Sequence, residues 1–142
     1  MTILVVDASV WVSAADATDR LSALSRIFLH AVMRQRTLIV LPAIARLEVA
    51  CALARRLRDA RQGRGLAEGL LRSPLIMEAA MDGPLLTVAL MQGTESFLRA
   101  GDAFYAAVAE NGGGLIVTWD DELIRRANAV TPETWLAEHK GP

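Results

Sequence analysis

Short apolar runs alternate with longer amphipathic segments along the chain. The runs at residues 3–6, 38–41, 75–79 and 115–118 are short and rich in Val, Ile and Leu, which favours buried strands. The segments between them repeat apolar residues at helical spacing, which indicates helices that each bury one face. These segments predict helices at 8–15, 20–35, 43–61, 66–71, 85–92, 102–111, 121–127 and a last helix that begins near Pro132.

Polar residues and glycines set the expected ends of these helices. We expect Asp19 to cap the second helix. Gly63 and Gly65 are expected to end the long helix that starts at residue 43, and Gly93 is expected to end the fifth helix.

Buried strands that alternate with helices indicate an α/β fold. We expect one domain over residues 1–142, with three α/β/α layers around a mostly parallel sheet of four to five strands, the fifth at 129–131. In such sheets ligands bind beyond the carboxyl ends of the strands. Asp7 directly follows the first strand, and Asp120 follows the strand at 115–118. The sheet can therefore bring these two carboxylates together.

Two further acids lie in strongly apolar helical sequence. Glu48 lies in the third helix and Asp102 at the start of the sixth, and a carboxylate near buried surface needs a partner. Simpler explanations exist for each acid. Asp7, Asp102 and Asp120 are all plausible helix N-caps, and Glu48 can pair with Arg55, seven residues later on the same helix. A metal role stays open, because a capping carboxylate has a second oxygen free.

Converging carboxylates indicate a divalent cation. Without one they repel and raise one another's pKa, and hard oxygen ligands select Mg²⁺, or Mn²⁺, over zinc. His30 and His139 lie far from the predicted strand ends, which disfavours zinc and a Cys–His nucleophile. The single cysteine, Cys51, cannot form an internal disulfide, and we expect a small buried thiol in a reducing cytoplasm.

Composition narrows the class of protein further. Apolar residues make up 53% of the chain and mean hydropathy is +0.31, which excludes disorder. No apolar run approaches the ~18 residues of a membrane span, and the N-terminus lacks the basic region that opens a signal peptide. The net charge of −1 argues against a protein that coats nucleic acid through bulk charge. Lys140 is the only lysine, so chemistry that needs a mid-chain lysine is excluded.

The order of the four acids resembles that of a known family. Asp7 follows the first buried strand, Glu48 lies on the third helix, Asp102 opens a helix, and Asp120 stands in a Thr-x-Asp motif. The segments VVDASVWV, LPAIARLEVACALAR, RAGDAFYAAVAENGGGLIVTWDDEL and VTPETWL carry this order and span most of the chain. The pattern is similar to the PIN domain, and more closely to the VapC-type toxins of bacterial type II toxin–antitoxin pairs.

This resemblance implies an activity and partners. It implies a Mg²⁺-dependent endoribonuclease that cuts specific structured RNA, such as tRNA or ribosomal RNA. It also implies an antitoxin protein whose C-terminal segment blocks the site, and an assembly that is a homodimer or a hetero-oligomer with the antitoxin. Two other members of the same class are kept as alternatives: a PIN nuclease of RNA maturation without an antitoxin, and a catalytically silent PIN-like binding module.

The resemblance also implies roles for particular residues. It implies an acidic metal pocket of Asp7, Glu48, Asp102 and Asp120, with hydroxyl support from Ser9 and Thr118. We expect Asp7 and Asp102 to be the primary ligands. Asp120 is expected to hold a second ion or act through water, and Glu48 to be a ligand or to orient the attacking water. Asp121 is next to Asp120 and can share its task.

A basic segment and an apolar surface complete the expected interfaces. Residues 55–64 carry five arginines against one acid, which favours contact with RNA phosphates, although a solvated helix face has the same composition. The candidate RNA-binding residues are Arg55, Arg56 and Arg61. We also expect some of four early apolar side chains to line a groove for a protein partner; they are Trp11, Val12, Phe28 and Leu29.

Two other α/β classes fit less well. A phosphoryl-accepting receiver domain needs a second acid beside Asp7 and a late lysine at the site, and the chain offers neither. A haloacid-type phosphatase needs Asp-x-Asp after the first strand, whereas the sequence there is Asp7-Ala8-Ser9.

Overall fold

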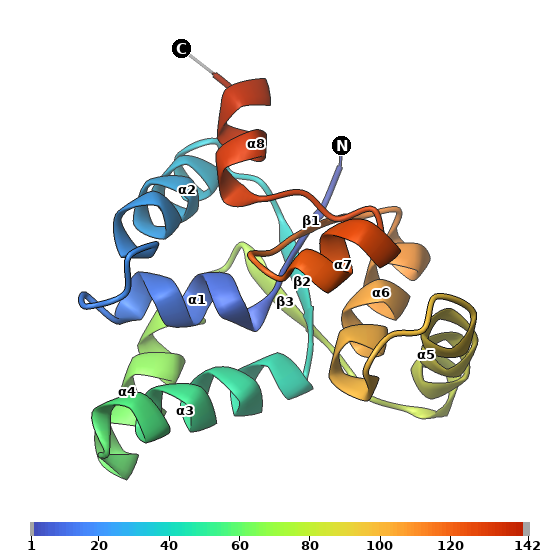
Figure 1. Cartoon of the computed structure of the whole chain (residues 1–142), viewed down its shortest axis with the longest axis horizontal. Coiled ribbons are helices and arrows are strands. Elements are labelled where there is room, and N and C mark those ends of the chain that lie inside the picture. Colours follow the sequence, from blue (N-terminus) through green and yellow to red (C-terminus); the bar gives the residue numbers. More distant parts are fainter. Residues whose placement is uncertain (1, 141–142) are drawn as a thin grey trace.

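A four-stranded parallel sheet forms the centre of the computed structural model, which describes residues 2–140 (Figure 1). Its strands are β1 (Leu4–Val6), β2 (Ile39–Pro42), β3 (Ile76–Ala79) and β4 (Leu115–Val117), in the spatial order β3-β2-β1-β4. All three pairings are parallel. The central strand β1 is buried along its whole length, as its continuous apolar run predicts.

Helices cover both faces of the sheet, so the predicted three-layer α/β/α fold is confirmed. Four helices connect the first three strands: α1 (Ala8–Ala15), α2 (Ser22–Arg34), α3 (Ile44–Leu57) and α4 (Ala60–Leu70). Two helices on the opposite side connect β3 to β4: α5 (Gly83–Glu95) and α6 (Ala100–Gly112). The chain ends with α7 (Asp121–Arg126) and α8 (Pro132–Glu138), and α8 packs on α2. Among residues 2–140, no helix is long and apolar enough to span a membrane.

The strand order fixes where a ligand site can form. From β1 the chain moves through β2 to β3 on one side, whereas β4 lies on the other side of β1. Because connections between parallel strands are right-handed, the helices of these two halves lie on opposite faces, and the carboxyl ends of β1 and β4 mark the point where this fold class binds ligands. Asp7 and the segment Thr118–Asp120 follow these two strands directly.

The predicted long helix at 43–61 and the short helix at 66–71 are wrong. The chain instead forms α3 and α4, which break at Arg58 and Asp59. Arg58 adopts a left-handed conformation (φ 53°), and the Asp59 side chain accepts a hydrogen bond from the backbone N–H of Gln62, which caps α4. Gly63 and Gly65, expected to end a helix, both lie inside α4.

Gly63 is a packing residue rather than a helix breaker. A β-carbon at this position would lie 2.7 Å from the β-carbon of Ala54 and 2.8 Å from the backbone oxygen of Ala50. The absence of a side chain therefore lets α4 fold back directly on α3. Gly93 acts in the same way inside α5, where a β-carbon would lie 2.8 Å from that of Ala103 on α6.

Three smaller expectations also change. Asp19 does not occupy the N-cap of α2: Leu21 does, and Asp19 accepts a hydrogen bond from the Leu21 N–H in the turn before it. The expected strand at 129–131 is a single parallel bridge between Val117 and Val130. Cys51 is exposed rather than buried, because the stripe of α3 that faces the core is formed by Ala45, Val49 and Leu53.

The expected partner groove on the early helices is also wrong for three of its four residues. Trp11, Val12 and Phe28 are buried in the core, and Leu29 packs against it. The indole N–H of Trp11 donates to the backbone oxygen of Val6 (3.1 Å), and the Phe28 ring packs edge-on against Trp135 of α8. Trp11, Val12 and Phe28 hold the layers together and are not available to a partner.

We predict opposite effects for two glycine substitutions in α4. Gly63→Ala should lower the free energy of unfolding by roughly 1–3 kcal/mol, because its methyl group would overlap Ala54 and the backbone of α3. Gly65→Ala should raise it by about 0.5–1 kcal/mol, because nothing lies within 4 Å of that position and alanine favours the helix. Urea unfolding midpoints of the two variants measure the difference. Equal midpoints would show that α3 and α4 do not pack through Gly63.

Candidate functional site

Asp7 lies at the carboxyl end of β1 and is held rigidly. Its backbone is extended and it caps α1, with the Ser9 N–H donating to Oδ2 at 3.2 Å. The Thr118 hydroxyl, which follows β4, donates to the same oxygen at 2.9 Å. The residue is 7% exposed. Within residues 2–140, Oδ1 accepts no hydrogen bond, so one carboxylate oxygen of a nearly buried acid is available to a ligand.

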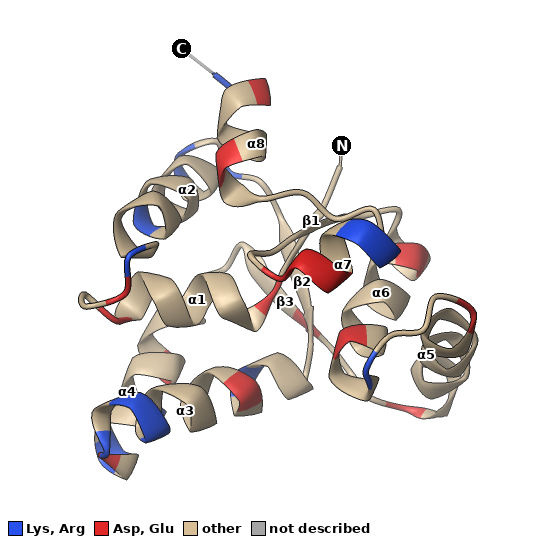
Figure 2. Ribbon diagram, in the orientation of Figure 1, with Lys and Arg blue, Asp and Glu red and all other residues tan. Residues whose placement is uncertain are grey.

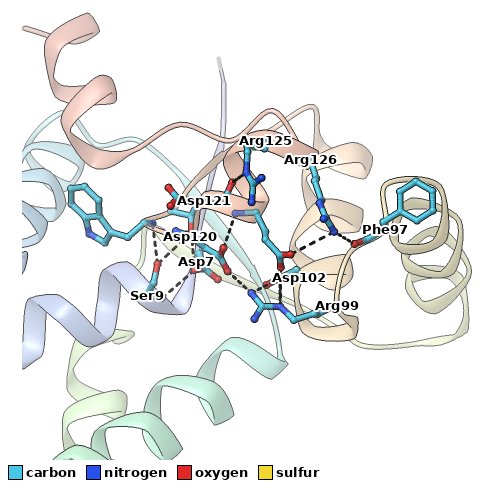
Figure 3. A network of polar contacts seen from close by, with 12 residues as sticks. Asp7, Ser9, Phe97, Arg99, Asp102, Asp120, Asp121, Arg125 and Arg126 are labelled. Atoms are coloured by element: carbon cyan, nitrogen blue, oxygen red, sulfur yellow. Dashed lines mark hydrogen bonds and ion pairs between the residues drawn. The ribbon is translucent and has the colours of Figure 1, made fainter.

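Ser9 and Thr118 tie the two strand ends together. Their hydroxyl oxygens lie 3.3 Å apart. The Ser9 hydroxyl oxygen accepts from the Trp119 N–H at 3.1 Å, and the Thr118 hydroxyl oxygen accepts from the Asp120 N–H at 2.9 Å (Figure 3). Residues more than a hundred positions apart are thus joined in one network around Asp7. Of the two hydroxyls, that of Thr118 contacts Asp7 directly, whereas that of Ser9 contacts Thr118 and Trp119.

Asp120 caps α7 with one carboxylate oxygen and forms an ion pair with the other. Its Oδ1 accepts from the Glu122 N–H at 2.8 Å, and its Oδ2 pairs with Arg99. Asp121 is exposed, and its side chain makes no ion pair or hydrogen bond within the described part of the chain. Of the two neighbouring acids, Asp120 is therefore the one that lies with the candidate site.

Glu48 approaches from α3 on one face of the sheet. The buried hydroxyl of Tyr105 donates to Glu48 Oε1 at 2.7 Å, so the alternative in which Glu48 pairs with Arg55 is wrong. A β-carbon on Gly101 would lie 3.0 Å from Glu48 Oε2, so this glycine leaves the room that the carboxylate occupies. Burial raises the pKa of Glu48, and the charges of Asp7 and Asp102 raise it further, whereas the Tyr105 hydrogen bond lowers it.

Asp102 approaches from α6 on the opposite face. It lies in the first turn of the helix, whose N-cap is Arg99, so the expectation that Asp102 is itself the N-cap is wrong. Burial raises the pKa of Asp102, the charge of Arg99 lowers it, and the charges of Asp7 and Asp120 raise it. Each of the four acids is therefore close enough to another to repel it.

Two residues at the site were not identified from the sequence. Tyr105 lies three residues after Asp102 on α6, and the burial of its ring raises the pKa of its hydroxyl well above the usual range. Arg99 lies three residues before Asp102 and pairs with Asp102 and Asp120. The three-residue spacing places Tyr105 and Arg99 on the same side of the helix as Asp102 and could have identified both.

The donor chemistry of the site fits a hard divalent cation. Carboxylates and hydroxyls are the ligands that Mg²⁺ prefers, and a cation would offset the repulsion that raises the pKa of Glu48 and Asp102. As the side chains lie, no three His, Cys, Asp or Glu residues between 2 and 140 are grouped closely enough to hold an ion. Arg99 lies against two of the acids. The site therefore has suitable donors, but they are not gathered as in a coordination shell.

The candidate RNA-binding arginines differ in their surroundings. Arg55 lines a hollow of about 370 Å³ between α1 and α3 that also contains Ser9 and Glu48. Arg56 lines it too, but its guanidinium pairs with Asp16 at 3.0 Å and Asp19 at 2.8 Å. Arg61 is exposed on α4 and makes no ion pair in the described residues. Figure 2 shows basic segments gathered where α3 meets α4, and acidic segments around the ends of β1 and β4.

The arrangement suits hydrolysis by an activated water. The partners of the four acids within residues 2–140 are hydroxyls, backbone N–H groups and a guanidinium, without a thiol or imidazole that could act as a nucleophile. The acids lie beyond the carboxyl ends of the strands, where this fold class binds ligands.

Comparisons with known proteins agree with the fold. A family model described as the PIN domain matches residues 4–129. The chain is similar to PAE2754 from Pyrobaculum aerophilum, with 26% identity, a TM-score of 0.68, and coverage of 96% of this chain and 88% of that one. It is also similar to Mycobacterium tuberculosis VapC20, described as a Sarcin-Ricin loop cleaving toxin, with 17% identity, a TM-score of 0.70, and coverage of 86% and 93%.

A third solved structure has the same fold. FitAcB from Neisseria gonorrhoeae is 18% identical, with a TM-score of 0.69 over 92% of this chain and 99% of that one. No curated relative matches the chain in sequence.

We predict that Glu48 destabilises the protein at neutral pH when divalent metal is removed. Its pKa in the folded state is raised above the ordinary value of 4.5, so the folded state binds the proton more tightly than the unfolded state. The free energy of unfolding therefore falls as the pH rises from 4.5 through the raised pKa. In Glu48→Gln the side-chain oxygen can still accept the hydrogen bond from the Tyr105 hydroxyl. This variant should be more stable than the wild type at pH 7 in EDTA. This gain should disappear below pH 4.5.

Thermal unfolding at several pH values measures this effect, with Glu110→Gln as the control. Glu110 is an exposed acid on α6, and its replacement should change stability by less than about 0.5 kcal/mol. A Glu48→Gln variant that is less stable than wild type at pH 7 would contradict the prediction.

Proposed function

Because the chain belongs to the PIN domain family, we propose that it is a divalent-metal-dependent endoribonuclease of the VapC toxin type. The observation that carries the proposal is the placement of Asp7 and Asp120 at the ends of β1 and β4, with Glu48 and Asp102 brought to them from opposite faces. A cation would offset the repulsion among four acids near the carboxyl ends of β1 and β4, and their chemistry suits phosphodiester hydrolysis.

We assign the expected ligand roles to this constellation. Asp7 and Asp102 would hold Mg²⁺, with Mn²⁺ as the alternative, and Asp120 would hold a second ion or act through water. Bound there, a divalent ion supplies charge that stabilises the phosphodiester transition state and lowers the pKa of a water molecule. Ser9 and Thr118 fix the position of Asp7 through the hydrogen bonds described above.

The chain's own groups would also orient the attack. Tyr105 holds Glu48 through Oε1, which leaves Oε2 to accept a hydrogen bond from the attacking water. The water would attack phosphorus in line with the leaving oxygen, so that the P–O bond on the leaving side breaks as the new one forms. Arg55, in the hollow beside Glu48, would contact a phosphate next to the cut.

The substrate and partners follow from the same assignment. The fold likeness to VapC20 and the segments that resemble VapC-type toxins support structured RNA, such as tRNA or ribosomal RNA, as the substrate. They also support an antitoxin protein as the partner, an assembly with the antitoxin or as a homodimer, and a cytoplasmic location. The competing assignments within the family are an RNA-processing nuclease without an antitoxin and a silent binding module.

We predict that RNA cleavage depends on both the metal and Asp7. Brief expression in bacteria followed by mapping of RNA ends should give a small set of new ends with the wild type. Asp7→Asn should lower their yield by roughly 100-fold or more, because a buried metal ligand is lost. Purified protein should lose activity in EDTA and recover it with Mg²⁺ or Mn²⁺.

Asp120→Asn and Asp121→Asn form a matched pair of adjacent acids. The first should lower activity at least tenfold, whereas the second should stay within about twofold of wild type, because the Asp121 side chain is exposed and makes no hydrogen bond or ion pair within the described residues. Correctly folded wild-type protein that binds RNA but leaves it intact in Mg²⁺ would identify the silent binding module instead.

Arg55 and Arg56 should separate RNA contact from structural support. Arg55→Gln should raise KM for RNA and reduce the slope of log affinity against log salt by about one, because one phosphate contact is lost. Arg56→Gln should mainly lower thermal stability, because its guanidinium pairs α3 with the turn that contains Asp16 and Asp19. RNA filter binding between 50 and 200 mM salt gives the slope. Equal KM and slope changes in both variants would remove Arg55 from the proposed interface.

A further inference from the structure

Arg99 is the cationic partner of the acids at the candidate site. Its Nε and Nη2 both lie 3.2 Å from Asp102 Oδ2, and Nη2 also pairs with Asp120 Oδ2. Its Nε lies 3.4 Å from Glu122 Oε2. Within residues 2–140, no other Lys, Arg or His side chain pairs with Asp7, Glu48, Asp102 or Asp120. Figure 3 shows the guanidinium beside Asp102, at the edge of the network around Asp7.

Arg99 occupies carboxylate oxygens of Asp102 and Asp120 that would otherwise be available to a metal ion. Asp102 is 13% exposed and Asp120 25% exposed at the side chain, and each directs Oδ2 toward the guanidinium. The other Asp120 oxygen caps α7 and is engaged by the Glu122 N–H. The only Asp120 oxygen left for a cation is thus Oδ2, and Arg99 already pairs with it.

Arg99 is also able to leave these acids. Its side chain is 67% exposed, and its backbone is extended at the N-cap of α6, outside the helix itself. The guanidinium end of these ion pairs is open to solvent, which weakens them. The neighbouring Arg126 is anchored differently, by the backbone oxygen of Phe97 at 2.6 Å and by Glu122 at 3.5 Å, so it can keep Glu122 occupied when Arg99 moves.

We propose that Arg99 competes with the divalent cation for Asp102 and Asp120, and that the displaced guanidinium binds a phosphate of the RNA. The inference rests on the proposed nuclease function. The planar fork of an arginine that pairs with carboxylate oxygens matches phosphate oxygens equally well. When the metal ion binds, it would release the guanidinium of Arg99 from the acids, and that guanidinium would then be free to bind RNA. Arg99 would therefore lower the affinity of the site for the metal ion and, once displaced, bind an RNA phosphate.

Calorimetric titration of Mn²⁺ alone into EDTA-treated, dialysed protein tests the competition. Arg99→Gln should bind Mn²⁺ roughly 3- to 10-fold more tightly than wild type, because two weak ion pairs no longer oppose it. Arg125→Gln is the matched control. It removes the same charge from nearby α7, where Arg125 donates only to the backbone oxygen of Asp121 within the described residues, so its affinity should stay within twofold of wild type.

Each outcome has a distinct meaning. Mn²⁺ affinity in Arg99→Gln that equals wild type, or is weaker, overturns the competition, because a guanidinium that merely braces the acids would help to hold the ion. Wild-type protein that shows no Mn²⁺ binding dependent on Asp7 contradicts the proposed function itself. If Arg99→Gln does not fold, Arg99→Ala, which also removes the charge, decides the matter: affinity above wild type supports the competition, and affinity at or below wild type overturns it.

The phosphate contact has its own measurement. At saturating Mg²⁺, Arg99→Gln should raise KM for end-labelled bulk tRNA by about 5-fold or more while binding metal more tightly, and Arg125→Gln should leave KM within twofold of wild type. Opposite shifts in metal and RNA affinity are the signature of a shared guanidinium, since a structural defect would weaken both. An unchanged KM in Arg99→Gln would overturn the phosphate role.

Discussion

Mutual repulsion among carboxylates at one end of the sheet is the constraint on which this structure depends. Asp7, Glu48, Asp102 and Asp120 come from β1, α3, α6 and the end of β4, and burial together with neighbouring charges raises the pKa of Glu48 and Asp102. A fold selected for stability alone would separate such groups or pair each with a cation. This chain keeps them together and partly unpaired, as expected where stability is given up for a binding function.

The two sides of the site offset this repulsion in different ways. On one side Asp7 is fixed by the Ser9 N–H and the Thr118 hydroxyl, which also join β1 to β4, so its position cannot change without disturbing the core. On the other side the exposed guanidinium of Arg99 holds Asp102 and Asp120 through contacts that can break. Under the proposed function, a rigid Asp7 beside the adjustable Asp102 and Asp120 would suit a site that accepts both a metal ion and RNA.

Small residues let neighbouring elements pack closely, and one of them lies beside an acid of the candidate site. Gly101 leaves room for the Glu48 carboxylate, Gly63 lets α4 pack on α3, and Gly93 lets α5 pack on α6. The sequence predicts helix ends at Gly63 and Gly93, because glycine has a low intrinsic helix propensity. Packing decides against that interpretation: a buried helix contact compensates the propensity cost, and only a neighbour distant in sequence reveals the contact.

The sequence alone determined the strands, the parallel α/β class and the placement of Asp7 and Asp120, because short apolar runs must be buried and a polar residue after each run must lie at the strand end. It also singled out Glu48 and Asp102 as acids in apolar surroundings. Only the tertiary structure decided the partners of these acids. Tyr105 donates to Glu48, 57 positions away in the sequence. Arg99 pairs with both Asp102 and Asp120, the latter 21 positions away. Local patterns report the burial of a segment, whereas the partner of a charged side chain depends on which segments the fold brings together.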